Sequence, residues 1–77
     1  MNVCVVGASG YAGQQLVALL LQHPEVDQLI LMASSTAGAL YSELNPAFKG
    51  RVDAPLLPAS ELMAPDFVKN HDIGAVF

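Results

Sequence analysis

The first apolar run of the chain, Val3 to Val6, contains no polar alternation. Such a run is typical of a strand buried on both faces, as in a parallel sheet covered by helices. A glycine-rich turn follows from Gly7 to Gly13, and a leucine-rich segment then continues to Gln22. The pattern predicts a strand, a tight turn and a helix between Asn2 and Gln22.

The predicted helix runs from Ala12 to Gln22, and one apolar face of it is expected to cover the sheet. His23 and Pro24 end it, because the residue before a proline is pushed out of the helical region. We interpret His23 as a helix-end residue without a catalytic role. The apolar face comprises Leu16, Leu19 and Leu20, with Val17 and Leu21 beside them.

A second apolar stretch, Val26 to Ala33, predicts a strand parallel to the first, with the helix as the crossover between them. The fold class we predict is therefore α/β, a Rossmann-like, doubly wound and mostly parallel sheet. Beyond Ala37 the pattern is less regular, and Val52 to Leu57, broken by Pro55, predicts a short edge strand. The other expected elements are short helices at Leu40 to Leu44, from a Ser60 cap to Met63 and from Pro65 to Asn70, and a strand at Asp72 to Phe77.

The turn after the first strand has glycine at its first, fourth and seventh positions. Gly7 permits the tight turn, Gly10 leaves space where a diphosphate would approach the backbone, and Gly13 lets the helix pack closely on the strand. The amides of Tyr11 and Ala12 remain free at the helix start, where an anion is favoured. We predict a dinucleotide site, and a turn that serves only close packing is the alternative.

The end of the second strand bears on the choice of cofactor. An NAD site usually places an Asp or Glu there to accept the ribose hydroxyls, but no carboxylate occurs between Gln28 and Leu40. Ser34 and Ser35 stand there instead, and hydroxyls and amides can donate hydrogen bonds to the extra phosphate of NADP. The sequence favours NADP, and an ordinary serine-rich loop is the alternative.

The net charge and the length of the apolar runs argue against nucleic acid and membranes as partners. The formal net charge is -4 and only three basic residues occur, so we expect no nucleic-acid partner. The longest apolar run, Leu16 to Leu21, is far shorter than the roughly 20 residues of a membrane-spanning helix, so we expect no membrane partner. One cysteine and no leader pattern indicate the cytoplasm.

Four motifs together resemble the N-acetyl-gamma-glutamyl-phosphate reductase family, and the resemblance spans nearly all of the 77 residues. They are Val6 to Gly13, Thr36-Ala37-Gly38, Glu43 to Pro46 and Phe48 to Gly50. The resemblance implies an NADP-dependent enzyme of arginine biosynthesis that reduces N-acetyl-gamma-glutamyl phosphate to N-acetyl-glutamate semialdehyde and releases phosphate. Many members have an Arg among the hydroxyl residues after the second strand, and this chain has none there.

The resemblance also implies roles for individual residues. The diphosphate would lie against Ser9, Gly10, Tyr11 and Ala12, and the adenosine-ribose phosphate against Ser34 and Ser35. The cysteine that forms a thioester with the substrate, and a histidine that assists proton transfer, are expected downstream of Phe77. Cys4 is not that nucleophile, because it lies within a buried strand without an activating base.

A covered parallel sheet is rarely stable in so short a chain, and the last apolar run stops within a strand. Residues 1–77 are therefore expected to be the N-terminal portion of a dinucleotide-binding domain, without the rest of that domain or the catalytic domain. The complete protein is expected to be a homo-oligomer. Two other functions remain open, which are aspartate-semialdehyde dehydrogenase and a non-catalytic NADP-binding regulatory protein.

Overall fold

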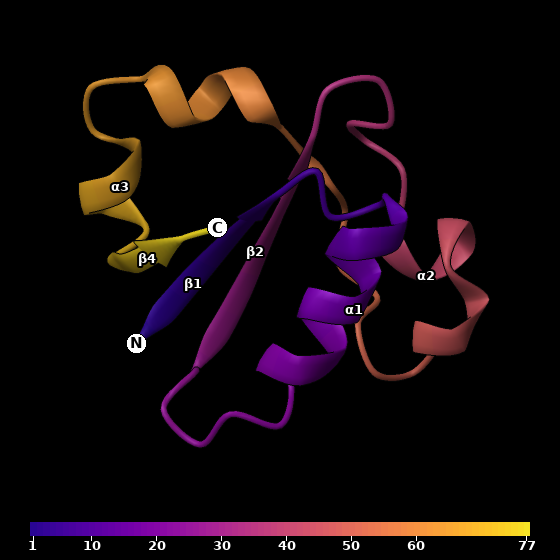
Figure 1. Ribbon diagram of the computed structural model, residues 1–77. Coiled ribbons are helices and arrows are strands. Elements are labelled where there is room, and N and C mark those ends of the chain that lie inside the picture. The colour runs from indigo at the N-terminus through magenta and orange to yellow at the C-terminus, as the bar shows by residue number, and fades with distance from the viewer.

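The computed structural model describes residues 1–77 and contains one sheet of four parallel strands (Figure 1). β1 (Asn2–Val6) lies between β2 (Gln28–Ala33) and β4 (Ile73–Val76), and β3 (Leu57–Pro58) pairs with the other side of β2. The strand order is β3-β2-β1-β4. This arrangement confirms the predicted Rossmann-like α/β fold.

The central pair of strands is regular, and the pairing with β4 is not. Asn2 of β1 lies opposite Gln28 of β2, and the register continues to Val6 opposite Met32. The register between β1 and β4 shifts after Asn2. The pairing extends one residue past β4, because Phe77 donates to the Cys4 carbonyl at 2.9 Å and accepts from the Val6 amide at 2.9 Å.

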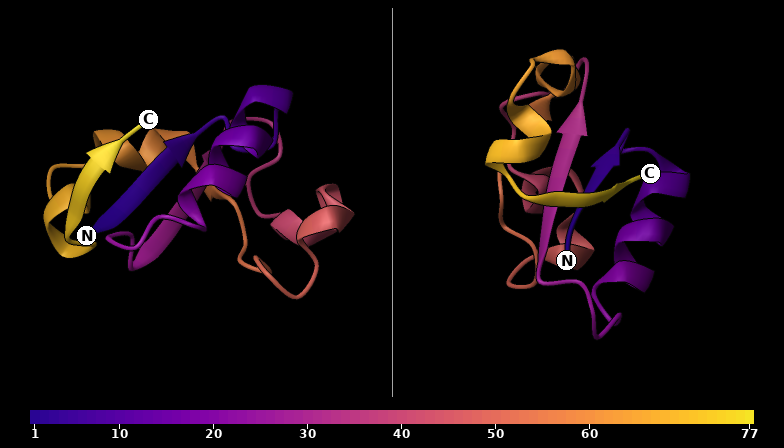
Figure 2. Two further views of the ribbon diagram at one scale, coloured as in Figure 1. Left: turned by 60° about the horizontal axis from the view of Figure 1, so that its bottom comes forward. Right: turned by 90° about the vertical axis from the view of Figure 1, so that its left-hand side faces the viewer.

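Helices cover both faces of the sheet, as Figure 2 shows with the sheet seen along its edge. α1 (Tyr11–Leu20) lies on one face, and the single-turn helix α3 (Phe67–Asn70) lies on the other. The alternation of side chains along β1 explains this division, since Val3 and Val5 join the core under α1 and Cys4 joins the core under α3. The remaining helical elements are α2 (Tyr41–Leu44) and the 3₁₀ helices η1 (Pro46–Phe48) and η2 (Ala59–Met63).

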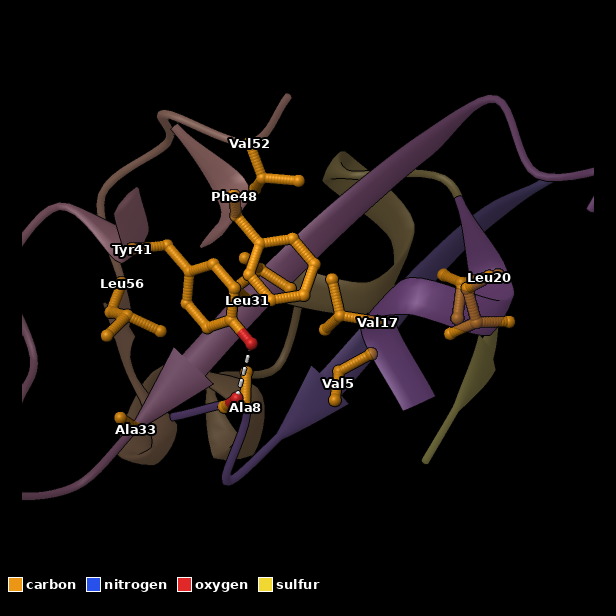
Figure 3. Close-up of a cluster of buried hydrophobic side chains, with 11 residues drawn as sticks. Val5, Ala8, Val17, Leu20, Leu31, Ala33, Tyr41, Phe48, Val52 and Leu56 are labelled. Atoms are coloured by element: carbon orange, nitrogen blue, oxygen red, sulfur yellow. Dashed lines mark hydrogen bonds between the residues drawn. The ribbon is translucent and has the colours of Figure 1, made fainter. Parts of the chain in front are cut away.

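The larger core lies between α1, the sheet and the segment that contains α2 and η1 (Figure 3). From α1, Val17 and Leu20 are buried in this core, and Leu16 packs against it in part, as does Leu21 directly after the helix. Leu19 is 69% exposed, so the prediction that it covers the sheet is wrong. The helix also ends at Leu20, two residues before the predicted end, because the chain already turns at Gln22 and His23 to reach β2.

The predicted strand from Val52 to Leu57 is wrong for most of its length, because β3 contains only Leu57 and Pro58. The preceding residues pair instead with the chain after β2. Gly38 donates to the Leu56 carbonyl at 2.7 Å, and Leu56 donates to the Ala39 carbonyl at 2.9 Å. An antiparallel bridge joins Leu40 to Pro55, and Tyr41 donates to the Ala54 carbonyl at 2.9 Å. This pairing holds residues 38–41 in place.

Two predicted helix starts also differ from the structure. Pro58, not Ser60, precedes the first residue of η2, and no side chain caps that helix. α3 begins at Phe67 rather than at Pro65 and ends at Asn70 as predicted. Both helices are so short that a proline or serine near the start does not determine which residue begins the helix.

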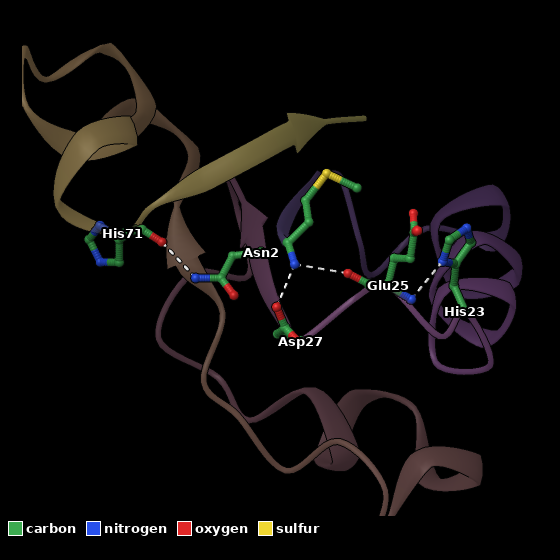
Figure 4. A network of polar contacts seen from close by, with 6 residues as sticks. Asn2, His23, Glu25, Asp27 and His71 are labelled. Carbon is green, nitrogen blue, oxygen red and sulfur yellow. Dashed lines mark hydrogen bonds and ion pairs between the residues drawn. The ribbon is translucent and has the colours of Figure 1, made fainter.

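Polar contacts join the amino ends of the strands, as Figure 4 shows. The amino group of Met1 contacts the Asp27 carboxylate and lies 2.9 Å from the Glu25 carbonyl. The Asn2 side chain donates to the His71 carbonyl at 2.9 Å. His23 lies three residues beyond the end of α1, and its Nδ1 accepts from the Glu25 amide at 3.2 Å in the connection to β2. None of the helices has the length and apolar content needed to cross a membrane.

Candidate functional site

The carboxyl ends of the four parallel strands lie at one edge of the sheet, and two of the predicted segments follow them directly. β1 ends at Val6 and is followed by Gly7, and β2 ends at Ala33 and is followed by Ser34. From β1 the chain proceeds to β2 and β3 on one side, and β4 takes the other side of β1. The strand order therefore reverses at β1, and ligands of open α/β sheets bind outside the carboxyl ends at this position.

The glycines of the turn after β1 have different structural roles. Gly7 has a φ of 73°, in the left-handed region that favours glycine, and its amide donates to the Met32 carbonyl at 2.9 Å. A Cβ atom at Gly13 would lie 2.8 Å from both Cα and the carbonyl oxygen of Ala8, and closer still to the Gly7 carbonyl. The close approach of α1 to the turn thus requires a glycine at position 13.

Gly10 is different, because the packing of the protein does not require it. A Cβ atom there would meet only the Gly7 carbonyl oxygen, at 3.6 Å, which is an ordinary contact distance. Its φ of -73° and ψ of 170° are also open to other residues. The exposed surface above Gly10 is therefore accessible to a ligand at the backbone itself, and a side chain at position 10 would reduce that access.

The start of α1 presents backbone N–H groups that have no partner within the protein. The first backbone donor to the helical pattern is Gln14, which donates to the Gly10 carbonyl at 2.9 Å. The amides of Ser9, Tyr11, Ala12 and Gly13 donate to no backbone or side-chain acceptor. N–H groups at a helix start, together with the positive end of its dipole, form a favourable environment for an anion such as a phosphate.

Two contacts from the segment after β2 hold this turn. The Ser9 hydroxyl oxygen lies 3.2 Å from the Thr36 hydroxyl oxygen. The hydroxyl of Tyr41, which is completely buried, donates to the Ala8 carbonyl at 2.7 Å, as Figure 3 shows. Burial in the core raises the pKa of the Tyr41 hydroxyl, which further favours its neutral, hydrogen-donating form. The segment after β2 thus fixes two consecutive residues of the turn.

Sequence reasoning did not assign either Thr36 or Tyr41 to the site. Thr36 had a usable signal, because it directly continues the hydroxyl pair Ser34-Ser35. Tyr41 had none, because the pairing of residues 38–41 with residues 54–56, which brings it under the turn, leaves no periodic pattern. Ser34 and Ser35 are exposed at the end of β2, and Thr36 is the hydroxyl residue of this loop that contacts the turn.

The turn lies on an open surface. A hollow of about 410 Å³ lies at the opposite edge of the sheet, beside Asp27, Gln28 and Arg51. We assign the site to the carboxyl edge because the unpartnered N–H groups and Gly10 are there. Tyr11, the first residue of α1, is 79% exposed beside them.

Cys4 lies away from this surface. It is completely buried with Ile30, Met32 and Phe67 on the α3 face of the sheet. Desolvation by this burial raises the pKa of its thiol above the ordinary value, so that the thiol stays protonated and unreactive at neutral pH. This agrees with the prediction that Cys4 lies within a buried strand without an activating base, where it packs as a small apolar residue.

Comparison with known proteins finds N-acetyl-gamma-glutamyl-phosphate reductases among the similar proteins. N-acetyl-gamma-glutamyl-phosphate reductase of Thermosynechococcus vestitus is 50% identical over 60 residues, which are 78% of this chain and 17% of the relative. The reductase of Pectobacterium carotovorum is 35% identical over an alignment that covers all of this chain and 27% of the relative. The reductase of Escherichia coli K12 is 45% identical over 80% of this chain and 20% of the relative. The chain thus spans about a quarter or less of the length of these relatives.

The family model of the semialdehyde dehydrogenase, NAD binding domain, matches residues 2–74. The match includes β1, the glycine turn, α1 and the loop after β2. A nicotinamide dinucleotide is accordingly the class of cofactor that this domain binds. The matched range covers nearly the whole chain, and the chain belongs to the family of semialdehyde dehydrogenase NAD-binding domains.

Proposed function

We propose that the glycine turn holds the diphosphate of NADP and that the complete protein reduces N-acetyl-gamma-glutamyl phosphate to N-acetyl-glutamate semialdehyde with release of phosphate. One observation carries the proposal. Unpartnered N–H groups surround Gly10 at the position where the strand order reverses, and the packing of the protein does not require a glycine there. The reductases to which the chain is similar support the choice of reaction.

The residues of the turn divide into two groups. Ser9, Tyr11 and Ala12 contact the diphosphate through their amides, with the Ser9 hydroxyl as a further donor, and Gly10, whose own amide donates to the Gly7 carbonyl, lets the diphosphate approach the backbone. Gly7 and Gly13 give the turn its shape, through the positive φ and the close approach to α1. Bound NADPH supplies the hydride for the reduction.

We propose that the cofactor is NADP rather than NAD because of the residues in the loop after β2. Ser34 and Ser35 are exposed at its start, and no carboxylate occurs from residue 28 to residue 40. Hydroxyl groups donate hydrogen bonds to a 2'-phosphate, whereas a carboxylate would repel it. Without an Arg in this loop the preference depends on neutral donors alone.

The catalytic residues of the complete protein lie outside residues 1–77 in this proposal. The length of the relatives supports this, since the chain spans 17–27% of them. Residues 1–77 then form the N-terminal portion of the dinucleotide-binding domain of a cytoplasmic homo-oligomer that acts on a small acyl phosphate.

Two measurements on the full-length protein test the proposal. Titration calorimetry with NADPH should show binding that Gly10→Val strongly weakens while the unfolding temperature is retained, because a branched side chain would occupy the space of the diphosphate. An unchanged affinity would leave only a packing role for the glycines.

The reaction is tested with two substrates under the same conditions. Reduction of N-acetyl-gamma-glutamyl phosphate in preference to aspartyl phosphate is the expected result. The opposite preference would indicate aspartate-semialdehyde dehydrogenase, and NADPH binding without reduction of either substrate would indicate a regulatory protein.

A further inference from the structure

The contact between Ser9 and Thr36 joins the two parts of the proposed cofactor site. The two hydroxyl oxygens lie 3.2 Å apart in a partly buried position, and either group can donate to the other. Ser9 belongs to the glycine turn, and Thr36 follows the serine pair at the end of β2. The direction of this hydrogen bond decides whether the Ser9 hydrogen is available to a ligand.

We propose that Thr36 is a positioning residue for the cofactor, because its hydroxyl donates to Ser9 and leaves the Ser9 hydrogen free to donate to the diphosphate. This inference rests on the proposed function of the turn. A hydroxyl has one hydrogen and two acceptor lone pairs, so Ser9 can accept from Thr36 and donate to a phosphate oxygen at the same time. Donors in such a chain polarise one another and strengthen the last bond.

Thr36 is held firmly enough for this role. Its carbonyl accepts from the Ala39 amide at 3.2 Å, and the following residues pair with residues 54–56. Tyr41, further along the same segment, donates from the core to Ala8, the residue before Ser9. The segment from Thr36 to Tyr41 is therefore held by hydrogen bonds at both of its ends.

Ser9 is also fixed from the side of the helix. The Gln14 side chain donates to the Ser9 carbonyl at 3.3 Å, and the Ser9 amide has no partner in the protein. These contacts hold the backbone of Ser9 in place, so that only its hydroxyl group is still free to rotate. Thr36 is the side chain that contacts this hydroxyl.

The test uses the full-length protein, NADPH as the ligand and titration calorimetry as the measurement. Thr36→Val removes the hydroxyl and keeps the branched shape, and Thr36→Ser keeps the hydroxyl. We expect Thr36→Val to weaken binding about fivefold, the size of one hydrogen bond between neutral groups, and Thr36→Ser to bind nearly as the wild type does. Ser60→Ala, which removes an exposed hydroxyl from η2, is the matched control and should not change the affinity.

A double-mutant cycle separates positioning from a general loss of structure. Ser9→Ala alone should weaken binding at least about tenfold, because its bond goes to a charged phosphate. In the Ser9→Ala background, Thr36→Val should cause no further loss, since Thr36 acts through Ser9. Unfolding temperatures of all variants are measured alongside.

Three results would overturn the inference. If Thr36→Val left the affinity unchanged while Ser9→Ala weakened it, the turn would bind the cofactor without Thr36. An equal fivefold loss in both backgrounds would show that Thr36 acts independently of Ser9. If the wild-type protein bound no dinucleotide, the proposed function itself would fail, and the inference with it.

Discussion

Alanine at two glycines of the same turn should separate folding from binding. At Gly13 the new Cβ atom would lie 2.8 Å from Cα and the carbonyl oxygen of Ala8, which are backbone atoms that cannot rotate away. Forcing α1 from the turn should reduce the free energy of unfolding by about 3 kcal/mol, the upper part of the usual range for overpacking. Gly13→Ala is therefore expected to destabilise the protein.

Gly10→Ala should instead leave folding nearly unchanged, because its Cβ atom would meet only the Gly7 carbonyl at 3.6 Å. Alanine is a poorer N-cap than glycine, but it lowers the entropy of the unfolded chain, and these opposing effects of about 0.5–1 kcal/mol each nearly cancel. Affinity for NADPH should fall about tenfold or more, since the methyl group would lie where the proposed site places the diphosphate. A tenfold loss corresponds to about 1.4 kcal/mol.

The assay pairs urea unfolding with titration calorimetry on the full-length protein and both variants. The reasoning is refuted if Gly10→Ala destabilises the protein as much as Gly13→Ala does, or if it binds NADPH as tightly as the wild type. The first result would mean that Gly10 serves packing, and the second that the absence of its side chain does not matter to the ligand.

Four further predictions follow from the core and from the loop after β2. Tyr41→Phe leaves the buried Ala8 carbonyl without its donor, so urea unfolding should show a loss of about 1–3 kcal/mol, and unchanged stability would contradict the contact. Cys4→Ser should leave turnover of the full-length protein largely intact, and loss of turnover with retained thermal stability would contradict a nucleophile located elsewhere. Ser34→Asp should shift the ratio of NADP to NAD affinity about ten- to a hundredfold toward NAD, because the new carboxylate would repel the 2'-phosphate. Both affinities are measured at one fixed salt concentration, and equal or better NADP binding by the variant would remove Ser34 from the site. Burial raises the pKa of the Cys4 thiol above its ordinary 9.0. The stability that the neutral thiol contributes should therefore be fully present below pH 9 and decline as the pH rises through the folded-state pKa. Urea unfolding across this range should show a smaller decline for Cys4→Ser than for the wild type.

The central βαβ unit could be predicted from the sequence because its signals are local. The apolar run from Val3 to Val6 and the glycines that follow specify a buried strand and a turn without reference to the rest of the chain. The buried face of α1 could not be read from the local pattern alone, since five neighbouring apolar residues allow several faces, and Leu19 is exposed. Tertiary contacts with β1 and β2 bury Val17 together with the predicted Leu20, and Leu19 lies outside this face.

The connection from residue 37 to residue 58 could not be predicted, because non-local pairing determines it. The apolar residues of Val52 to Leu57 suggested a strand of the main sheet, but most of their backbone pairs with residues 38–41. That pairing also brings Tyr41 beneath the glycine turn, 33 residues from Ala8 in the sequence. The shape of the site therefore depends on contacts that no local pattern records.

A crystal structure of the full-length protein with bound NADP⁺ tests the central claim most directly. The measured quantity is the distance from the diphosphate oxygens to the amide nitrogens of Ser9, Tyr11 and Ala12. The account predicts hydrogen-bond distances of about 2.7–3.2 Å at the start of α1. A diphosphate bound elsewhere, for example beside Arg51 at the opposite edge of the sheet, would contradict it.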